Sequence, residues 1–164
     1  MDSVMENLSR QIGLVLMRQG CTVGCAESCT GGNIAASLTA VPGSSAYFKG
    51  GVVAYAAEVK TSLLGVNAQT LEREGVVSRQ TACEMAAGAL KALETDYAVA
   101  TTGLAGPGGG TDSVPVGTIW IAAGSEKKMV AFCQTIDKGR EANVKRATQK
   151  ALEMLLELLQ SHEK

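Results

Sequence analysis

The chain has 164 residues, of which 46% are hydrophobic, and a formal net charge of −1. This length favours one domain over residues 1–164, and the hydrophobic content suffices for a core. The near-neutral charge argues against nucleic-acid binding, which usually requires a basic stripe. No apolar run reaches membrane-spanning length and the N-terminus lacks a secretory signal, so we expect a cytoplasmic protein with no membrane partner.

Five cysteines without a secretory signal favour reduced thiols. There is no CxxC pair, and the single histidine, His162, lies in the tail. These features argue against a zinc site, and the cysteines fit the role of small buried apolar residues. We therefore expect no metal ion.

Hydrophobic periodicity and turn residues predict alternating helices and strands. The predicted helices cover residues 3–18, 31–39, 57–64, 69–74, 79–93 and 141–160. The predicted strands cover residues 21–25, 47–55, 97–101, 116–123 and 128–136. Gly50 and Gly51 indicate a bulge or a close approach in the second strand. Strands that first alternate with helices and then end in a hairpin predict an α/β fold with a mixed sheet and helices on both faces.

The stretch AESCTGG at residues 26–32 places Ser28 where the first strand turns into a helix. The N–H groups and the positive dipole end of such a helix favour anions and developing oxyanions. Ser28 is therefore a candidate nucleophile, although glycine-containing junctions of this kind are also common without a function.

Three segments follow strand ends, at residues 27–32, 55–60 and 102–111, and ligands bind at the carboxyl ends of strands in open α/β sheets. A nucleophilic serine needs a base, and the position of the only histidine excludes a Ser-His-Asp triad. Lys60 can replace histidine if desolvation lowers its pKa; otherwise it is a solvated helix lysine.

The glycine-dense loop at residues 102–111 has two interpretations. Its amides can cradle a phosphate or an oxyanion, or the loop can be a flexible cover. It matches neither standard nucleotide-binding fingerprint. Arg140, which opens the last predicted helix, either grips a phosphate or is simply exposed.

Several strings together resemble the CinA C-terminal domain family, named after competence-damage-inducible protein. They are AESCTGG at 26–32, PGSS at 42–45, Tyr55 followed by Lys60, LLGV at 63–66, TGLAGPGGGT at 102–111 and PVGT at 115–118. The resemblance implies a three-layer α/β/α domain, with a mostly parallel sheet that ends in an antiparallel hairpin. It also implies hydrolysis of nicotinamide mononucleotide to nicotinate mononucleotide and ammonia in pyridine-nucleotide salvage, without a cofactor. Many members carry a further N-terminal domain, and we expect this chain to be the stand-alone form.

Carried over to this sequence, the resemblance implies that Ser28 is the nucleophile and Lys60 the general base, with Tyr55 orienting the base or relaying a proton. Amides at Thr102 and Gly103, or in the turn after Ser28, would serve the oxyanion. The implied substrate-binding residues are Glu27, Cys29, Thr30, Gly31, Gly32, Ser44, Ser45, Thr102, Gly103, Gly106, Gly108, Gly109 and Arg140.

Two departures from the family pattern affect these expectations. The family usually has Ser-Asn after the tyrosine, whereas this chain has Ala56 and Ala57, and losing one positioned hydrogen bond costs on the order of ten- to a thousandfold in activity. The arginine often found four positions after Arg140 is Val144 here. The alternative function is therefore a weak or inactive member that binds a nucleotide or regulates a partner. The small-residue helix at 79–93 contains either a subunit interface or a core contact, and we expect a homo-oligomer.

Overall fold

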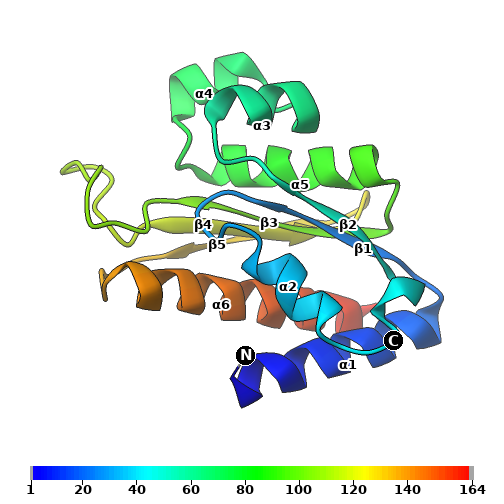
Figure 1. Ribbon diagram of the computed structural model, residues 1–164. Helices are drawn as coiled ribbons and strands as arrows, with labels where there is room; N and C mark the ends of the chain where they lie inside the picture. Colours follow the sequence, from blue (N-terminus) through cyan, green and yellow to red (C-terminus); the bar gives the residue numbers. More distant parts are fainter. Residues whose placement is uncertain (1, 163–164) are drawn as a thin grey trace.

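The computed structural model describes residues 2–162 and contains one five-stranded sheet in the order β2-β1-β3-β4-β5 (Figure 1). The strands are β1 (Val23–Glu27), β2 (Phe48–Val53), β3 (Tyr97–Gly103), β4 (Ile119–Gly124) and β5 (Met129–Gln134). β1 pairs in parallel with β2 and β3, whereas β4 pairs antiparallel with both β3 and β5. Only β4 therefore runs against the others, which confirms a mostly parallel sheet with a terminal hairpin.

Helices cover both faces of the sheet (Figure 1). One face carries α1 (Ser3–Gln19), α2 (Asn33–Thr39) and α6 (Arg140–Ser161). The other carries α5 (Arg79–Leu93), with α3 (Ala57–Leu64) and α4 (Ala68–Glu74) packed on the outer side of α5, while the short helix η1 (Ser44–Ala46) precedes β2. This arrangement confirms the three-layer α/β/α fold. None of the helices in this part of the chain combines the length and the apolar character that crossing a membrane requires.

Several predicted strand boundaries were wrong by two or three residues, for local reasons. β1 starts and ends two residues later than expected. β4 begins at Ile119 because Gly117, at φ 94°, lies in a turn closed by the Thr118 N–H and the Pro115 carbonyl. β5 ends at Gln134, before Ile136 adopts a left-handed φ of 71°.

The predicted irregularity in the second strand is present. The register between β1 and β2 shifts between Val23 and Gly24, which pair with Phe48 and Gly50. A Cβ atom at Gly51 would lie 2.7 Å from the Cys25 sulfur, so this position has no room for a side chain.

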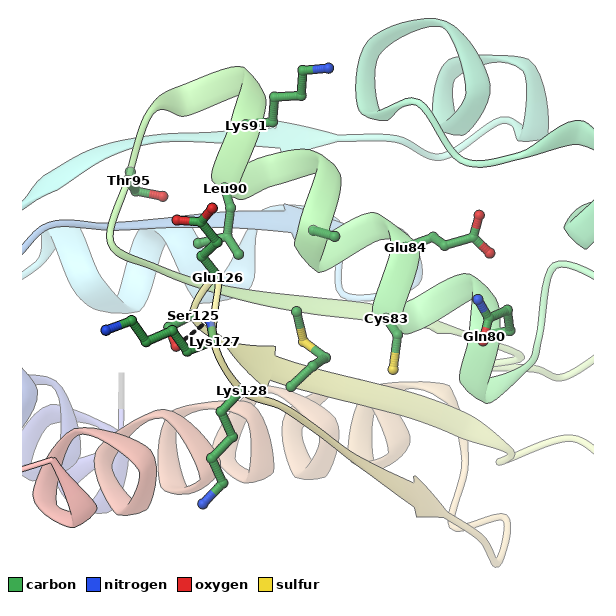
Figure 2. A pocket seen from close by; sticks show the side chains of 12 residues that line it. Gln80, Cys83, Glu84, Leu90, Lys91, Thr95, Ser125, Glu126, Lys127 and Lys128 are labelled. Carbon is green, nitrogen blue, oxygen red and sulfur yellow. Dashed lines mark hydrogen bonds between the residues drawn. The ribbon is translucent and has the colours of Figure 1, made fainter.

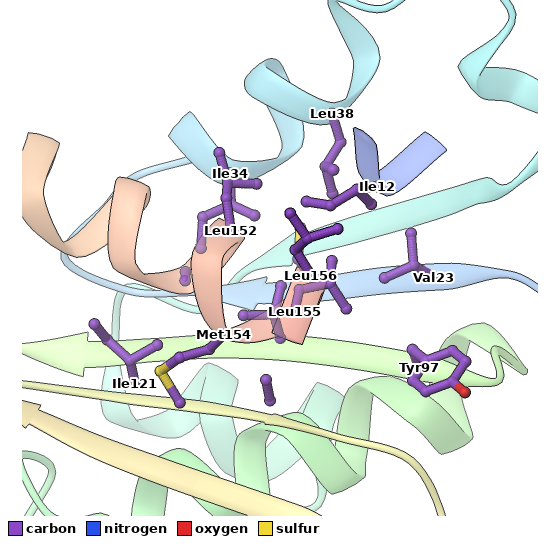
Figure 3. Close-up of a cluster of buried hydrophobic side chains, with 14 of the residues drawn as sticks. Ile12, Val23, Ile34, Leu38, Tyr97, Ile121, Leu152, Met154, Leu155 and Leu156 are labelled. Carbon is purple, nitrogen blue, oxygen red and sulfur yellow. The ribbon is translucent and has the colours of Figure 1, made fainter. Parts of the chain in front are cut away.

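The larger hydrophobic cluster lies between the sheet and α1, α2 and α6 (Figure 3). Large aliphatic side chains such as Ile12, Ile34 and Leu155 fill it and are fully buried. The second cluster, under α5, consists mainly of alanines. Its buried residues include Ala26, Ala82, Ala86, Ala89 and Ala100. The small residues of α5 therefore make a core contact with the sheet.

A glycine determines how α3 lies against α5. A Cβ atom at Gly88 of α5 would collide with the backbone of Leu64 at the end of α3. The missing side chain lets the two helices touch. Lys60 lies one turn before Leu64 on the same side of α3, so this close packing also fixes the position of Lys60.

Candidate active site

Glu27 and Ser28 are neighbours at the end of β1 but point to opposite faces of the sheet, as successive strand residues do. The Glu27 side chain points toward α2. Its carboxylate accepts hydrogen bonds from the backbone N–H groups of Ile34 (2.9 Å) and Ala35 (3.0 Å) and from the Thr30 hydroxyl (2.7 Å). A buried carboxylate at a helix N-terminus stabilises that helix. Glu27 was predicted to bind substrate. Its carboxylate instead binds Thr30 and the first turn of α2, and thereby fixes the turn that follows Ser28.

We expect Glu27→Gln to lower the free energy of unfolding by about 2 kcal/mol, because an amide nitrogen cannot accept from the N–H groups of α2. Thermal or urea unfolding measures this change. Glu72→Gln, at an exposed site in α4, is the matched control and should leave the stability unchanged. Equal stability of the two variants would contradict the role assigned to Glu27.

Ser28 and Lys60 meet on the opposite face, where the Lys60 side chain reaches from α3 to the residue that follows β1. Lys60 Nζ lies 2.9 Å from Ser28 Oγ and donates a second hydrogen bond to the Ala54 carbonyl at 2.7 Å. The exposed fractions are 8% for Ser28 and 2% for Lys60. Burial lowers the pKa of Lys60 below its usual value, because the charged ammonium loses its hydration. A hydroxyl and a desolvated amine in contact are the parts that a serine nucleophile and its base require.

Cys29, the next residue, is a second potential nucleophile beside Lys60. Burial raises the pKa of its thiol to about 12, so the thiol stays protonated near neutral pH. A nucleophilic cysteine requires the thiolate. The environment therefore favours Ser28.

A cavity of about 300 Å³ opens over this pair, where segments that follow β1, β2 and β3 converge. Nine of the residues predicted for the site line it, namely Ser28, Cys29, Tyr55, Lys60, Thr102, Gly103, Gly106, Gly108 and Arg140. An adjoining cavity of about 630 Å³ between α2 and α6 shares Cys29, Tyr55 and Arg140 and adds Thr30 and Gly31. The three strand-end segments thus form one site, as expected from the topology.

Arg140, the first residue of α6, lies where the two cavities meet. Its guanidinium donates to the Gly106 carbonyl at 2.7 Å and to the Tyr55 hydroxyl at 3.0 Å. Tyr55 was expected to orient Lys60, but its hydroxyl contacts Arg140, and the Ala54 carbonyl orients the lysine instead. The site therefore has a Ser–Lys pair at its floor and a fixed guanidinium at its rim.

The structure leaves four predicted binding residues outside both cavities, besides Glu27. Ser44 and Ser45 belong to η1, which leads into β2; since β2 is parallel to β1, they lie at the amino edge of the sheet, opposite the site. Gly32 is the N-cap of α2, and its φ of 103° explains why glycine is required there. Gly109 has a φ of 90° and lies near Leu104 in the glycine-dense loop.

Two cavity residues that lie outside the three predicted segments, Val76 and Val77, were missed. They connect α4 to α5, and no motif marks a pair of valines between two helices as part of a site. Their approach depends on how α3 and α4 pack on α5, which sequence periodicity does not specify.

A larger hollow, of about 760 Å³, lies between α5 and the turn joining β4 to β5 (Figure 2). Its rim carries Lys91, Glu126, Lys127 and Lys128, and it contains none of the residues that form the Ser–Lys site.

Within residues 2–162, no three His, Cys, Asp or Glu side chains are grouped so that they could hold a metal ion. The Ser–Lys cavity is therefore the place where hydrolytic chemistry has its required groups.

Comparisons with known proteins agree with the fold and cover nearly the whole chain. The family model of the CinA C-terminal domain matches residues 5–159. The nicotinamide-nucleotide amidohydrolase PncC of Escherichia coli (strain K12) is 44% identical over 155 residues, which make up 94% of each chain. The crystal structure of the competence/damage inducible protein CihA from Agrobacterium tumefaciens has a TM-score of 0.93 and 41% identity, and the match covers 96% of each chain.

Other relatives are longer. The CinA-like protein of Endomicrobium trichonymphae is 46% identical over 150 residues, which are 92% of this chain but 35% of that protein. The chain thus spans little more than a third of the length of the first curated relatives that it matches.

Proposed function

The chain belongs to the CinA C-terminal domain family, and from this membership and the geometry of its site we propose that it is a nicotinamide-nucleotide amidohydrolase. The proposed substrate is nicotinamide mononucleotide, and the products are nicotinate mononucleotide and ammonia. The observation that carries the proposal is the 2.9 Å contact between Lys60 Nζ and Ser28 Oγ, two buried side chains that line one cavity. The name of the relative PncC, which this chain matches over 94% of its length, supports the same activity.

In the proposed mechanism, neutral Lys60 accepts the Ser28 proton while Ser28 Oγ forms a bond to the carboxamide carbon. The C–N bond of the tetrahedral intermediate then breaks, and the lysine ammonium returns the proton to the leaving nitrogen, which departs as ammonia. A water molecule attacks the resulting ester, gives its proton through Lys60 to the Ser28 oxygen, and releases the carboxylate.

The backbone supports this sequence in two places. The Ala54 carbonyl holds the amine of Lys60 toward Ser28. The amide of Cys29 directly follows the nucleophile, at the start of the turn that leads into α2. We assign it to the developing oxyanion, where one such donor typically contributes about 3 kcal/mol.

Arg140 is proposed to bind the phosphate of the substrate, because a guanidinium at the cavity rim recognises a phosphate with paired donors. We expect Arg140→Ala to raise the KM for nicotinamide mononucleotide by roughly ten- to a hundredfold, as charge-assisted hydrogen bonds contribute about 1.5–3 kcal/mol. The KM for nicotinamide riboside, which has no phosphate, should change little. Steady-state ammonia release with both substrates measures the two effects.

Arg146→Ala is the control for this experiment. Arg146 also lies in α6, but its guanidinium donates to the Thr135 and Ile136 carbonyls, away from the cavity. An equal rise in KM for both substrates in the Arg140 variant would show that Arg140 does not recognise the phosphate.

A second candidate function is a binding module that holds the nucleotide without turnover. The observation that favours it is Ala57, which lines the cavity where the family usually has an asparagine amide. Stabilisation by nicotinamide mononucleotide in a thermal shift, together with no ammonia release, would support this module. Ammonia release that requires Ser28 would support the enzyme.

A further inference from the structure

The turn between α4 and α5, residues 75–78, is held in place by hydroxyl groups. Ser78 Oγ and Thr81 Oγ1 both donate to the Gly75 carbonyl, at 3.1 Å and 2.8 Å. Ser78 Oγ also accepts from the Thr81 N–H, which is the N-cap bond of α5. These bonds fix the turn to the first residues of α5.

Thr102 attaches the same turn to the sheet. It lies near the carboxyl end of β3, is 1% exposed, and donates from Oγ1 to the Val76 carbonyl at 2.7 Å. Strand alternation puts Thr102 on the same face as Ala98 and Ala100, which pack under α5. The strand that ends at the catalytic cavity therefore holds the turn directly.

The turn contributes only apolar side chains to the cavity. Val76 and Val77 both line it. The charged and titratable residues that line the cavity are Cys29, Tyr55, Lys60 and Arg140, and all of them come from other segments. One side of the cavity is therefore an apolar wall.

We infer that the flat face of the substrate's pyridinium ring packs against the wall formed by the 75–78 turn, that this wall keeps water away from Lys60, and that Thr102 is the positioning residue for the wall. The inference rests on the proposed function. It adds that the wall selects amides whose carboxamide is attached to a flat ring. A ring against Val76 and Val77 leaves its carboxamide free to meet Ser28, while the ribose phosphate extends toward Arg140 at the rim. Excluding water also favours the neutral amine that the base needs.

Thr102→Val tests the positioning role, because valine keeps the shape of threonine and removes the bond to the Val76 carbonyl. We expect the acid limb of the kcat/KM profile to move toward higher pH by about half a unit or more, since a looser wall admits water to Lys60 and raises its pKa. Thr39→Val, which removes an exposed hydroxyl bond within α2, should leave the profile in place. An unshifted limb in a folded Thr102→Val protein would overturn the positioning role.

Val77→Ala tests the wall without touching the hydroxyl bonds. Isothermal titration should show binding of nicotinamide mononucleotide weakened about fivefold or more, and binding of ribose 5-phosphate, which lacks the pyridinium ring, unchanged. Equal weakening of both ligands, or of neither, would overturn the wall. This measurement does not need turnover, so failure of the inference is distinguishable from failure of the proposed hydrolysis, which shows as absence of ammonia from the wild-type protein.

Discussion

Ser28→Ala is expected to reduce ammonia release from nicotinamide mononucleotide by at least about a thousandfold, because the nucleophile and its base act as a unit and the loss of either one removes the covalent route. The 2.9 Å contact with Lys60 is the physical reason for this expectation. A coupled ammonia assay at saturating substrate measures the change in kcat. The substrate should still stabilise the variant in a thermal shift, since the substitution removes one oxygen and leaves the cavity walls in place.

Two variants serve as controls. Ser45→Ala lies at the opposite edge of the sheet and should keep kcat within about twofold. Cys29→Ala should keep most of the activity, because the thiol remains protonated and does not compete with Ser28 as nucleophile. If Cys29→Ala abolished turnover while Ser28→Ala retained it, the assignment of the nucleophile would be reversed.

The sequence predicted best those parts of the site that follow the ends of strands. Three segments following β1, β2 and β3 were expected to converge, and the parallel pairing of these strands brings Ser28, Lys60 and Gly106 to one cavity. Parallel strands place their carboxyl ends at the same edge, so order along the chain is enough for this inference.

The sequence failed where a side chain's direction or a helix packing angle decides the outcome. Glu27 is adjacent to Ser28 in the chain, but strand alternation sends it to the other face, where it caps α2. Val76 lines the cavity because Thr102 of β3 and the first residues of α5 hold the turn between α4 and α5 there. Tyr55 lies five residues before Lys60 and nevertheless contacts Arg140, 85 residues away, which no local pattern indicates.

Lys60→Met should reduce kcat by roughly a hundred- to ten-thousandfold, the usual contribution of a general base. Lys60→Arg should be equally inactive, because a guanidinium stays protonated at any working pH. In the wild-type protein, kcat/KM should rise with pH and level off above the pKa of Lys60, which burial places below 10.5. A pH profile that is flat through this region would contradict the role of Lys60 as base.

The desolvation of the Lys60 amine also predicts how the free energy of unfolding changes with pH. The unfolded lysine has a pKa near 10.5 and the folded one a lower pKa, so between these two values the unfolded state binds more protons. The stability of the wild-type protein must therefore rise with pH across this window. Lys60→Met lacks this dependence, so its melting temperature relative to the wild type should fall as the pH increases toward 10.5.

Lys49→Met, at an exposed position in β2, is the matched control, and its difference from the wild type should stay constant over the same range. A constant difference for Lys60→Met as well would mean that the amine is fully hydrated in the folded protein. Such an amine would be mostly protonated near neutral pH and could not accept the Ser28 proton, because the base must be neutral before the serine attacks. The stability measurement therefore tests the mechanism without substrate, and it does so independently of the ammonia assay.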